Sequence, residues 1–357
     1  MFPSNEKGRR GNRDDENLKT VGALNIDMDA KAPFVTVVTP FYNTEDYLSE
    51  CIESVLQQTY KNWEYVLLNN YSTDGSVQIA EHYAKLHPDR IRLEHNSVFL
   101  SQVENYNQVL RFMSPKSKYC KFVQADDMLF SRCLELMVDT AERDSSIGVV
   151  GSYALEGSTV EFDGLPYPSP MVNGREVCRL LFLDDLYLFG SPTQLLIRSD
   201  LVLARTPFFN KSYYPFEDAV VMLEVLEHCN FGFVHQVLTF SRRHDGSVMK
   251  SLLALDCLIA TRLFLLREFG QRFLEPEEYQ VELKRKERRY AHVLVDGMVA
   301  LRGKSFWEFH RAMRKRMGYT FKSTRTWWLF FVGLCDVLLN PKRTLRLFYN
   351  GLRRSKQ

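Results

Sequence analysis

The sequence has no long hydrophobic run and no excess of charge of one sign. Its longest apolar stretch, from Trp327 to Cys335, is interrupted at Asp336 and is far shorter than the roughly 20 apolar residues of a membrane-spanning helix. The segment from Met1 to Lys31 is polar and mixed in charge, so it lacks the apolar region of a secretory signal. With 46 Lys and Arg against 44 Asp and Glu, the net charge is only +2, which argues against a protein that coats nucleic acid.

Cysteine is also sparse, and its spacing lacks the signature of a metal or redox motif. The seven cysteines are scattered, none forms a CxxC pair, and most lie in apolar segments. An odd number of such residues is typical of a reducing compartment, where thiols serve as small core side chains. Together these absences predict a cytoplasmic protein.

Charge is nevertheless distributed unevenly along the chain. From Gly270 to Gln357, 20 Lys and Arg accompany only 8 Asp and Glu, whereas the rest of the chain has 26 against 36. This basic region also contains Trp327, Trp328 and Phe331, and aromatic side chains beside basic ones suit an anionic membrane surface. The alternative is that the apolar stretch packs on the rest of the protein while the charges face solvent. Peripheral attachment to the inner face of the membrane therefore stays open, and nucleic acid is not expected because no binding motif is present.

The remaining composition is that of a globular protein with one large domain and an appendage. Of the 357 residues, 45% are hydrophobic and 25% are charged. Short apolar runs alternate with segments in which apolar residues recur at helical spacing. This alternation predicts a mostly parallel α/β sheet with strands over 34–40, 64–68, 91–95, 119–124 and 147–152. We expect a flexible arm over 1–32, the sheet domain over 33–250 with a long loop over 156–172, and a helical basic region over 251–357.

Polar side chains gather where the predicted strands end. They lie at Pro40 to Asn43, at Asn69 to Asp74, and at Asp126 and Asp127. Because parallel sheets bind ligands at the carboxyl ends of their strands, we expect these three clusters to converge on one site.

Each cluster suggests a chemistry and has a structural alternative. Adjacent carboxylates such as Asp126 and Asp127 repel each other, and a divalent cation between them and a phosphate would relieve that repulsion. Tyr42 offers a flat face for a base, and Asn43 offers amide donors and acceptors. The alternative is turn chemistry alone, since Asn, Ser, Asp and Gly all favour turns.

The motifs taken together resemble those of family 2 glycosyltransferases. The chain contains, in order, VTVVTPFYNTEDYL, CIESVLQQTY, WEYVLLNNYSTDGS, FVQADD, FEDAVVMLEVL and SRRHDGS. The resemblance covers roughly Phe34 to Val248. It implies a GT-A fold, a Rossmann-like mostly parallel sheet flanked by helices, and an inverting enzyme of the bacterial type. It further implies that 33–152 binds a nucleotide sugar and that 153–250 carries the acceptor and catalytic part.

The resemblance also implies roles for individual residues. Asp218 matches the catalytic base, and Asp126, Asp127 and His244 match positions that hold Mg²⁺ or Mn²⁺. The positions that match donor-binding residues are Pro40, Tyr42, Asn43, Asn70, Asp126 and Arg243. The expected reaction moves a sugar from a nucleotide-diphosphate sugar, with UDP expected, to a hydroxyl of a sugar or lipid-linked sugar acceptor in cell-surface polysaccharide or glycolipid synthesis.

Three departures from the family pattern keep a second interpretation open. Asn69 and Asn70 stand where aspartates are usual, Gln124 replaces the first aspartate of the metal motif, and Glu104 stands where many relatives carry arginine. These changes fit a pseudoenzyme that binds a nucleotide sugar with little or no catalysis. A nucleotidyltransferase is discounted, because the segment after the first strand contains no glycine-rich phosphate loop.

Overall fold

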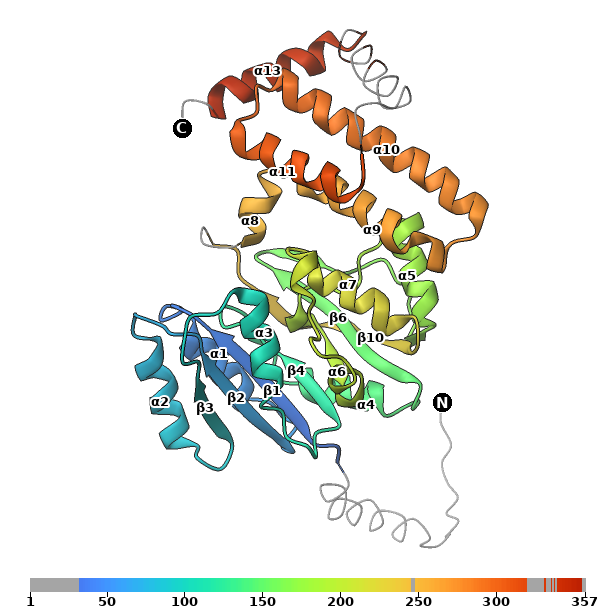
Figure 1. The fold of residues 1–357 in the computed structure, drawn as a ribbon. Coiled ribbons are helices and arrows are strands. Elements are labelled where there is room, and N and C mark those ends of the chain that lie inside the picture. Colours follow the sequence, from blue (N-terminus) through green and yellow to red (C-terminus); the bar gives the residue numbers. More distant parts are fainter. Residues whose placement is uncertain are drawn as a thin grey trace, which may run out of the picture.

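The structure is a computed structural model that describes residues 32–244, 248–319, 331, 335, 337 and 339–354. The expected arm lies outside these residues except for its last position, and so do Trp327 and Trp328. Figure 1 shows a twisted sheet flanked by helices, with a group of further helices stacked at one end. The strands are β1 (Val35–Phe41), β2 (Trp63–Asn69), β3 (Ile91–His95), β4 (Tyr119–Phe122), β5 (Met128–Leu129), β6 (Ile147–Glu156), β7 (Thr159–Glu161), β8 (Met171–Val172), β9 (Leu196–Arg198) and β10 (Asn230–Ser241).

Helices connect most of these strands and also form the C-terminal region. They are α1 (Leu48–Leu56), α2 (Ser76–Leu86), α3 (Gln102–Leu110), α4 (Cys133–Ala141), α5 (Gly174–Leu183), α6 (Ser199–Leu203), α7 (Glu217–Leu226), α8 (Val248–Leu253), α9 (Cys257–Phe273), α10 (Pro276–Val299), α11 (Lys304–Arg316) and α13 (Pro341–Arg354), with the short 3-10 helices η1 (Pro192–Gln194) and η2 (Lys211–Tyr213). The elements expected from periodicity are thus present, and the prediction of a mostly parallel α/β fold is confirmed.

The sheet has ten strands, eight of them in the order β3-β2-β1-β4-β9-β6-β10-β5. β1 to β4 are joined by parallel pairing, and β10 pairs parallel with β6. β9 lies antiparallel between β4 and β6, so β6 again runs in the direction of β4. The carboxyl ends of β1, β2, β3, β4, β6 and β10 therefore share one edge.

Two apolar layers hold the sheet, because the strand side chains alternate between its faces. On one face Val37, Tyr65 and Leu67 pack against α1, α2 and α4. On the other face Val38 and Val66 pack against α3, α5 and α7. The continuous apolar runs in the sequence are explained by this burial on both faces.

The C-terminal helices share the second of these cores. Buried residues of α9, α10 and α11, such as Phe264, Tyr290 and Met313, belong to the same cluster as Phe182 of α5 and Leu223 of α7. These helices stack beyond α5 and α7 at one end of the molecule in Figure 1. None of the helices that the structure describes is both long enough and apolar enough to span a bilayer.

Two local expectations were wrong. β6 extends to Glu156 and turns back into β7, and β8 pairs with β10, so the segment over 156–172 is not one long loop. Three prolines in that segment masked its two short strands, whose pairing partners are distant in the sequence. Pro40 does not end the first strand, since it is buried within β1 and pairs with Leu68 before the strand ends at Phe41.

Candidate functional site

The loops after β1, β2, β4 and β10 carry most of the predicted site residues. Since these strands run in one direction, their loops emerge at the same edge of the sheet. Asn43 links the first two loops: its Oδ1 accepts from the Thr73 backbone N–H at 2.8 Å, and its own N–H donates to Ser72 Oγ at 3.1 Å. Its backbone φ of 50° lies in the left-handed region, which asparagine tolerates better than most residues. Asn43 thus fixes the loop that presents Tyr42.

A buried amide network fixes the loops after β2 and β3. Asn70 is 3% exposed, and its Oδ1 accepts from the Leu100 N–H and from Asn96 Nδ2, each at 3.0 Å. Its own Nδ2 donates to the Leu100 carbonyl at 2.9 Å, and Asn96 also donates to Asn105 of α3 at 2.8 Å. Asn70 therefore has a structural task, and one of its amide hydrogens lies outside this network.

Two aromatic rings form an exposed pair at this edge. Tyr42 is 43% exposed, and Phe99, in the loop after β3, is 57% exposed. Their ring centroids lie 4.8 Å apart at an interplanar angle of 61°. Solvent-exposed aromatic faces held on ordered loops are suited to stacking with a planar base. Tyr42 was predicted from the sequence, whereas Phe99 was not, because its only signal is an apolar SVFL segment beyond a short strand.

Asp126 and His244 come together from distant parts of the chain. His244 Nε2 lies 3.0 Å from Asp126 Oδ2, and its ring packs 5.1 Å from that of Tyr47. Asp126 follows β4, whereas His244 follows β10, so only the fold joins them. Both side chains are partly exposed, at 33% for Asp126 and 24% for His244, and can be reached by a ligand.

Asp127 lies deeper than Asp126. It is 3% exposed, and its Oδ2 has no hydrogen-bond partner. Burial raises the pKa of Asp127 to about 7, and the charge of Asp126 is the second cause of this rise. Hydrogen bonds from the hydroxyls of Thr193 and Ser241 lower the pKa and offset part of the rise. A buried carboxylate oxygen without a partner is costly, and a cation would offset that cost.

The fit of a divalent cation to these residues depends on this donor set. Within the described ranges no three His, Cys, Asp or Glu side chains are grouped to hold a metal ion, so a shared role for Asp126, Asp127 and His244 stays a prediction. Mg²⁺ and related ions often use only one or two protein ligands together with substrate phosphates. The Asp126–His244 contact and the unpartnered Asp127 oxygen fit such a shared site.

The two arginines before His244 are already engaged. Arg243 Nε lies 3.4 Å from Glu156 and its Nη2 lies 3.6 Å from Glu161, both on the β6–β7 hairpin. Arg242 pairs with Glu50 of α1. A donor contact by Arg243 stays a prediction, and it would require this side chain to share or exchange its partners.

Glu217 and Asp218 begin α7, where Glu217 is buried and Asp218 is partly buried. Glu217 is 7% exposed and its Oε2 has no hydrogen-bond partner, while Asp218 Oδ1 accepts from the Ala219 N–H at 2.7 Å. Burial raises the pKa of Asp218 to about 6, and burial together with the charge of Asp218 raises that of Glu217 to about 7. A carboxylate poised near neutral pH is suited to accept a proton.

Tyr106 of α3 is linked by a hydrogen bond to Gln124, two residues before Asp126. Its buried hydroxyl accepts from Gln124 Nε2 at 2.7 Å and from Gln102 Nε2 at 2.8 Å. Burial is the main cause of the raised pKa of Tyr106, and the charges of Asp126 and Glu217 contribute to it. Gln124, the departure from the family's metal motif, therefore serves as a hydrogen-bond donor inside the site.

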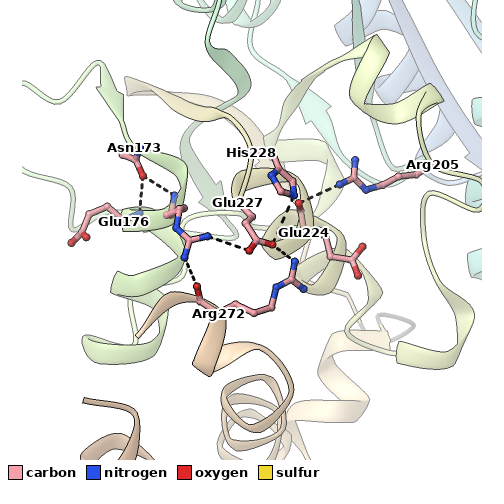
Figure 2. A network of polar contacts seen from close by, with 8 residues as sticks. Asn173, Glu176, Arg205, Glu224, Glu227, His228 and Arg272 are labelled. Carbon is pink, nitrogen blue, oxygen red and sulfur yellow. Dashed lines mark hydrogen bonds and ion pairs between the residues drawn. The ribbon is translucent and has the colours of Figure 1, made fainter. Parts of the chain in front are cut away.

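A second polar region lies at the opposite edge of the sheet, where β6 and β10 begin. A cavity of about 350 Å³ there is lined by residues that include Ser146, Arg198 and Cys229. Figure 2 shows the neighbouring network, in which Glu227 at the end of α7 binds Arg272 of α9. Glu227 also lies 3.1 Å from Arg175 of α5. The charges of this network compensate one another. The network therefore holds α5, α7 and α9 together, at a distance from Asp218.

Comparison with known proteins identifies the domain. The model of the family described as Glycosyl transferase family 2 matches residues 36–202. These residues, a little under half of the chain, form a glycosyl transferase family 2 domain. The protein EpsE of Bacillus subtilis, named as a glycosyltransferase, is 34% identical over 153 residues, which are 41% of this chain and 54% of EpsE. The chain thus spans about half the length of this curated relative.

Solved structures show the same fold at low sequence identity. S. aureus TarS 1–349 has a TM-score of 0.56 and 14% identity, covering 90% of this chain and 92% of that one. The complex of that fragment with UDP-GlcNAc has a TM-score of 0.51 and 17% identity, covering 75% and 83%. The mannosyltransferase PcManGT from Pyrobaculum calidifontis, in complex with GDP-Man and Mn²⁺, has a TM-score of 0.51 and 15% identity, covering 87% and 88%. The predicted GT-A fold is confirmed by this likeness.

Proposed function

We propose that the protein is an inverting, metal-dependent glycosyltransferase that moves a sugar from a nucleotide-diphosphate sugar to a hydroxyl group. The observation that carries this proposal is the pairing of two unlike acidic groups at one sheet edge. Asp126 contacts His244, whereas Asp218 lies apart from that pair at the start of α7, partly buried and with its pKa raised by burial to about 6. The first pair suits a diphosphate with its cation, and the second group suits a general base.

The donor nucleotide would lie over the loops after β1, β2 and β3. Its base would stack on the Tyr42–Phe99 pair, and the free amide hydrogen of Asn70 would reach a base carbonyl. UDP is the expected nucleotide, in line with the UDP-GlcNAc complex of TarS, while GDP is the competitor because PcManGT binds GDP-Man.

A divalent cation would be held by Asp126 and His244, with Asp127 behind them. When bound, Mg²⁺ or Mn²⁺ would neutralise negative charge on the diphosphate leaving group. The chain's own residues orient the remaining groups. The His244 ring is held against Tyr47, and Thr193 fixes the turn that carries Asp126, because its Oγ1 accepts from the Gln124 N–H at 3.0 Å.

Asp218 would remove the proton from the acceptor hydroxyl as that oxygen attacks the anomeric carbon. Attack on the face opposite the leaving group inverts the configuration in a single displacement. The proton passes to an Asp218 oxygen, whose raised pKa matches it to this task near neutral pH. Glu217 lies beside it in the sequence, and burial followed by the charge of Asp218 raises the pKa of Glu217 to about 7.

The acceptor is proposed to be a sugar or lipid-linked sugar of a cell-surface polysaccharide or glycolipid. Support comes from α13, where Leu345 is 57% exposed and Phe348 is 40% exposed on a helix that contains Lys342 and Arg346. Phe331 is 66% exposed just before it. An exposed apolar face beside basic residues suits an anionic membrane surface.

Liposome co-sedimentation tests this attachment. Replacing Leu345 and Phe348 by serine should abolish pelleting on vesicles that contain phosphatidylserine at low salt. The control is Val281→Ser, because Val281 is an apolar side chain of comparable exposure, 64%, on another helix, α10. Negligible pelleting of the unmodified protein, or equal pelleting of all three forms, would contradict the membrane role.

The proposed activity is tested by a screen of UDP- and GDP-sugars with Mn²⁺. Thermal unfolding reports binding, and release of free nucleotide reports turnover. A rise in unfolding temperature together with Mn²⁺-dependent nucleotide release is the expected result. Binding without release under any condition would favour the pseudoenzyme, for which the engaged Arg243 is the supporting observation. Neither binding nor release would contradict the proposal.

A further inference from the structure

A single connecting segment, residues 185–194 between α5 and η1, contacts both halves of the candidate site and the C-terminal helices. It begins at Asp185, passes Tyr187 and ends in η1 with Thr193 and Gln194. No sequence motif falls in this segment. Its contacts nevertheless come from α9, α10, β4 and β10, which are far apart in the sequence.

The first end of the segment is fastened by three cations. Asp185 accepts from Lys286 Nζ and from Arg289 Nη1, the latter at 2.7 Å, and Arg262 Nη1 lies 3.6 Å away. The Asp185 carboxylate is 17% exposed and Lys286 is 3% exposed, so this ion pair is largely shielded from water. Asp185 has a φ of 57°, a backbone conformation that needs support from its surroundings. The supporting charges come from α9 and α10, outside the matched family domain.

The other end of the segment touches the residues around Asp126 and Asp127. Thr193 Oγ1 accepts from the Gln124 N–H at 3.0 Å, and the Thr193 carbonyl accepts from the buried Lys121 Nζ at 2.6 Å. Gln194 Nε2 donates to Ser241 Oγ at 2.8 Å, at the end of β10. This end of the segment is therefore anchored by the residues around Asp126 and Asp127, independently of Asp185.

The middle of the segment is fixed by its own packing. The Tyr187 ring packs 5.5 Å from that of Phe189 and 6.5 Å from that of Phe162, and its hydroxyl donates to the Gly190 carbonyl at 3.4 Å. Burial raises the pKa of Tyr187, and the charges of Asp218 and Glu217 contribute. The chain then turns at Gly190 with a φ of 60°. A Cβ there would lie 2.8 Å from both Phe162 and Gln194, so the packing leaves no space for a side chain. The position of Tyr187 is thus set by what fixes the chain on either side of it.

We propose that Asp185 is a positioning residue through which α9 and α10 hold the 185–194 segment, and with it Tyr187, against the acceptor side of the site. This inference rests on the proposed function. The C-terminal helices are then part of the catalytic unit rather than only an attachment. Asp185 acts through the segment and touches no reacting atom.

The chain offers a closely matched control for this proposal. Glu227 is also a carboxylate between arginines of the same domain junction, and its side chain is 16% exposed. It stands at the end of α7, and Asp218 stands at the start of that helix. Nine residues at 1.5 Å per residue separate the two by roughly 13 Å. Glu227→Gln therefore loosens the junction without touching the segment.

Hydrogen–deuterium exchange of the full-length protein is the first test, and it requires no substrate. Asp185→Asn should raise exchange of peptides within 186–194 by about tenfold or more, whereas Glu227→Gln should leave them at the wild-type level. Asp185→Glu, which retains the charge, should restore protection. Unchanged exchange in Asp185→Asn, or an equal rise in Glu227→Gln, would overturn the proposal. If Asp185→Asn fails to fold, Arg289→Met takes its place. This substitution removes one of the three cations, and the Arg289 side chain is 45% exposed, so its loss leaves the core intact.

Kinetics provide the second test, with UDP-GlcNAc and GDP-mannose as donor probes. Nucleotide release by Asp185→Asn should show kcat lowered roughly 10-fold to 100-fold, as small displacements at a reacting centre do. Binding of UDP or GDP with Mn²⁺ should change less than about threefold. Raised exchange with an unchanged kcat would overturn the positioning role. If the wild-type protein releases no nucleotide, the proposed function fails, while the exchange experiment still decides whether Asp185 holds the segment.

Discussion

The two sides of the site treat their buried polar groups in opposite ways. On the donor side Asn70, Asn96 and Asn105 satisfy one another and the backbone of the loop after β3. On the acidic side, where the cation and the catalytic base are proposed to lie, Asp127 and Glu217 each keep a buried carboxylate oxygen without a hydrogen-bond partner. The first set resembles the interior of any stable protein, whereas the second is costly in the ligand-free state.

This difference distinguishes residues that fix the shape of the site from residues whose buried charge becomes favourable only when a ligand binds. Neutral amides that bond to each other fix loop positions, and their contribution does not depend on pH. Buried acids without partners have raised pKa values and gain a favourable environment only when a cation or an acceptor proton arrives. Substitutions on the two sides should therefore have opposite effects on stability and activity.

The largest effect is expected for Asp218→Asn. The change keeps the shape of the side chain and removes the base, so kcat should fall by roughly 10²-fold to 10⁴-fold while Mn²⁺-dependent nucleotide binding stays nearly the same. Steady-state nucleotide release and titration with UDP or GDP measure the two quantities. Asp127→Asn is the contrasting variant and should weaken nucleotide binding in the presence of Mn²⁺. Wild-type turnover by Asp218→Asn would show that another group is the base.

The pH dependence of turnover should follow the same carboxylate. A base with a pKa near 6 is protonated and inactive at lower pH, so kcat should fall about tenfold per pH unit below about 6 and level off above it. A profile of kcat between pH 4.5 and 8.5 measures this. A kcat that stays constant down to pH 5 would argue against Asp218 in this role.

Stability should respond to Glu217→Gln in a pH-dependent way. The folded-state pKa of Glu217, about 7, is above its ordinary value of 4.5, so its favourable contribution is complete below about pH 4.5 and is lost as pH rises through about 7. Because glutamine cannot ionise, the variant should have a free energy of unfolding higher by up to about 3 kcal/mol at pH 8 and similar at pH 4. Urea unfolding at both pH values is the measurement. A variant that is less stable at pH 8 would contradict the assignment of Glu217 as a strained acid.

The smallest effect is expected on the donor side, where Asn96→Ala removes the central amide. Asn70 Oδ1 and Asn105 Oδ1 would each lose a buried donor, so the free energy of unfolding should fall by about 1–3 kcal/mol at every pH. Nucleotide affinity should fall with it, while the pH profile of kcat keeps its shape. A loss of stability confined to high pH would remove the contrast between the two sides.

The order of elements could be predicted from the sequence because the signals are local. Apolar runs such as the one around Val37 are buried on both faces, and α1 has a clear apolar period through Leu48, Ile52 and Val55. The antiparallel β9 between β4 and β6, and the short β7 and β8, depend on pairing between distant segments. No local pattern in Leu196 or Met171 records such pairing.

The site was predictable to the extent that strand ends in a parallel sheet must meet. That rule, with the family motifs, singled out Asp126, His244 and Asp218 before their surroundings were known. It could not show that Arg243 is paired with Glu156, or that Asp185 is enclosed by three cations. Those contacts depend on how elements distant in the sequence are placed relative to one another, and the sequence does not give that placement.

The central claim is that the donor diphosphate and its cation lie at the Asp126–His244 pair. Anomalous scattering from Mn²⁺, in crystals grown with UDP and separately with GDP, locates that cation directly. The account predicts a manganese peak within about 2.0–2.6 Å of an Asp126 oxygen, with the nucleotide base on the Tyr42–Phe99 side. A peak elsewhere, such as in the cavity beside Ser146 and Cys229 at the opposite edge of the sheet, would contradict it.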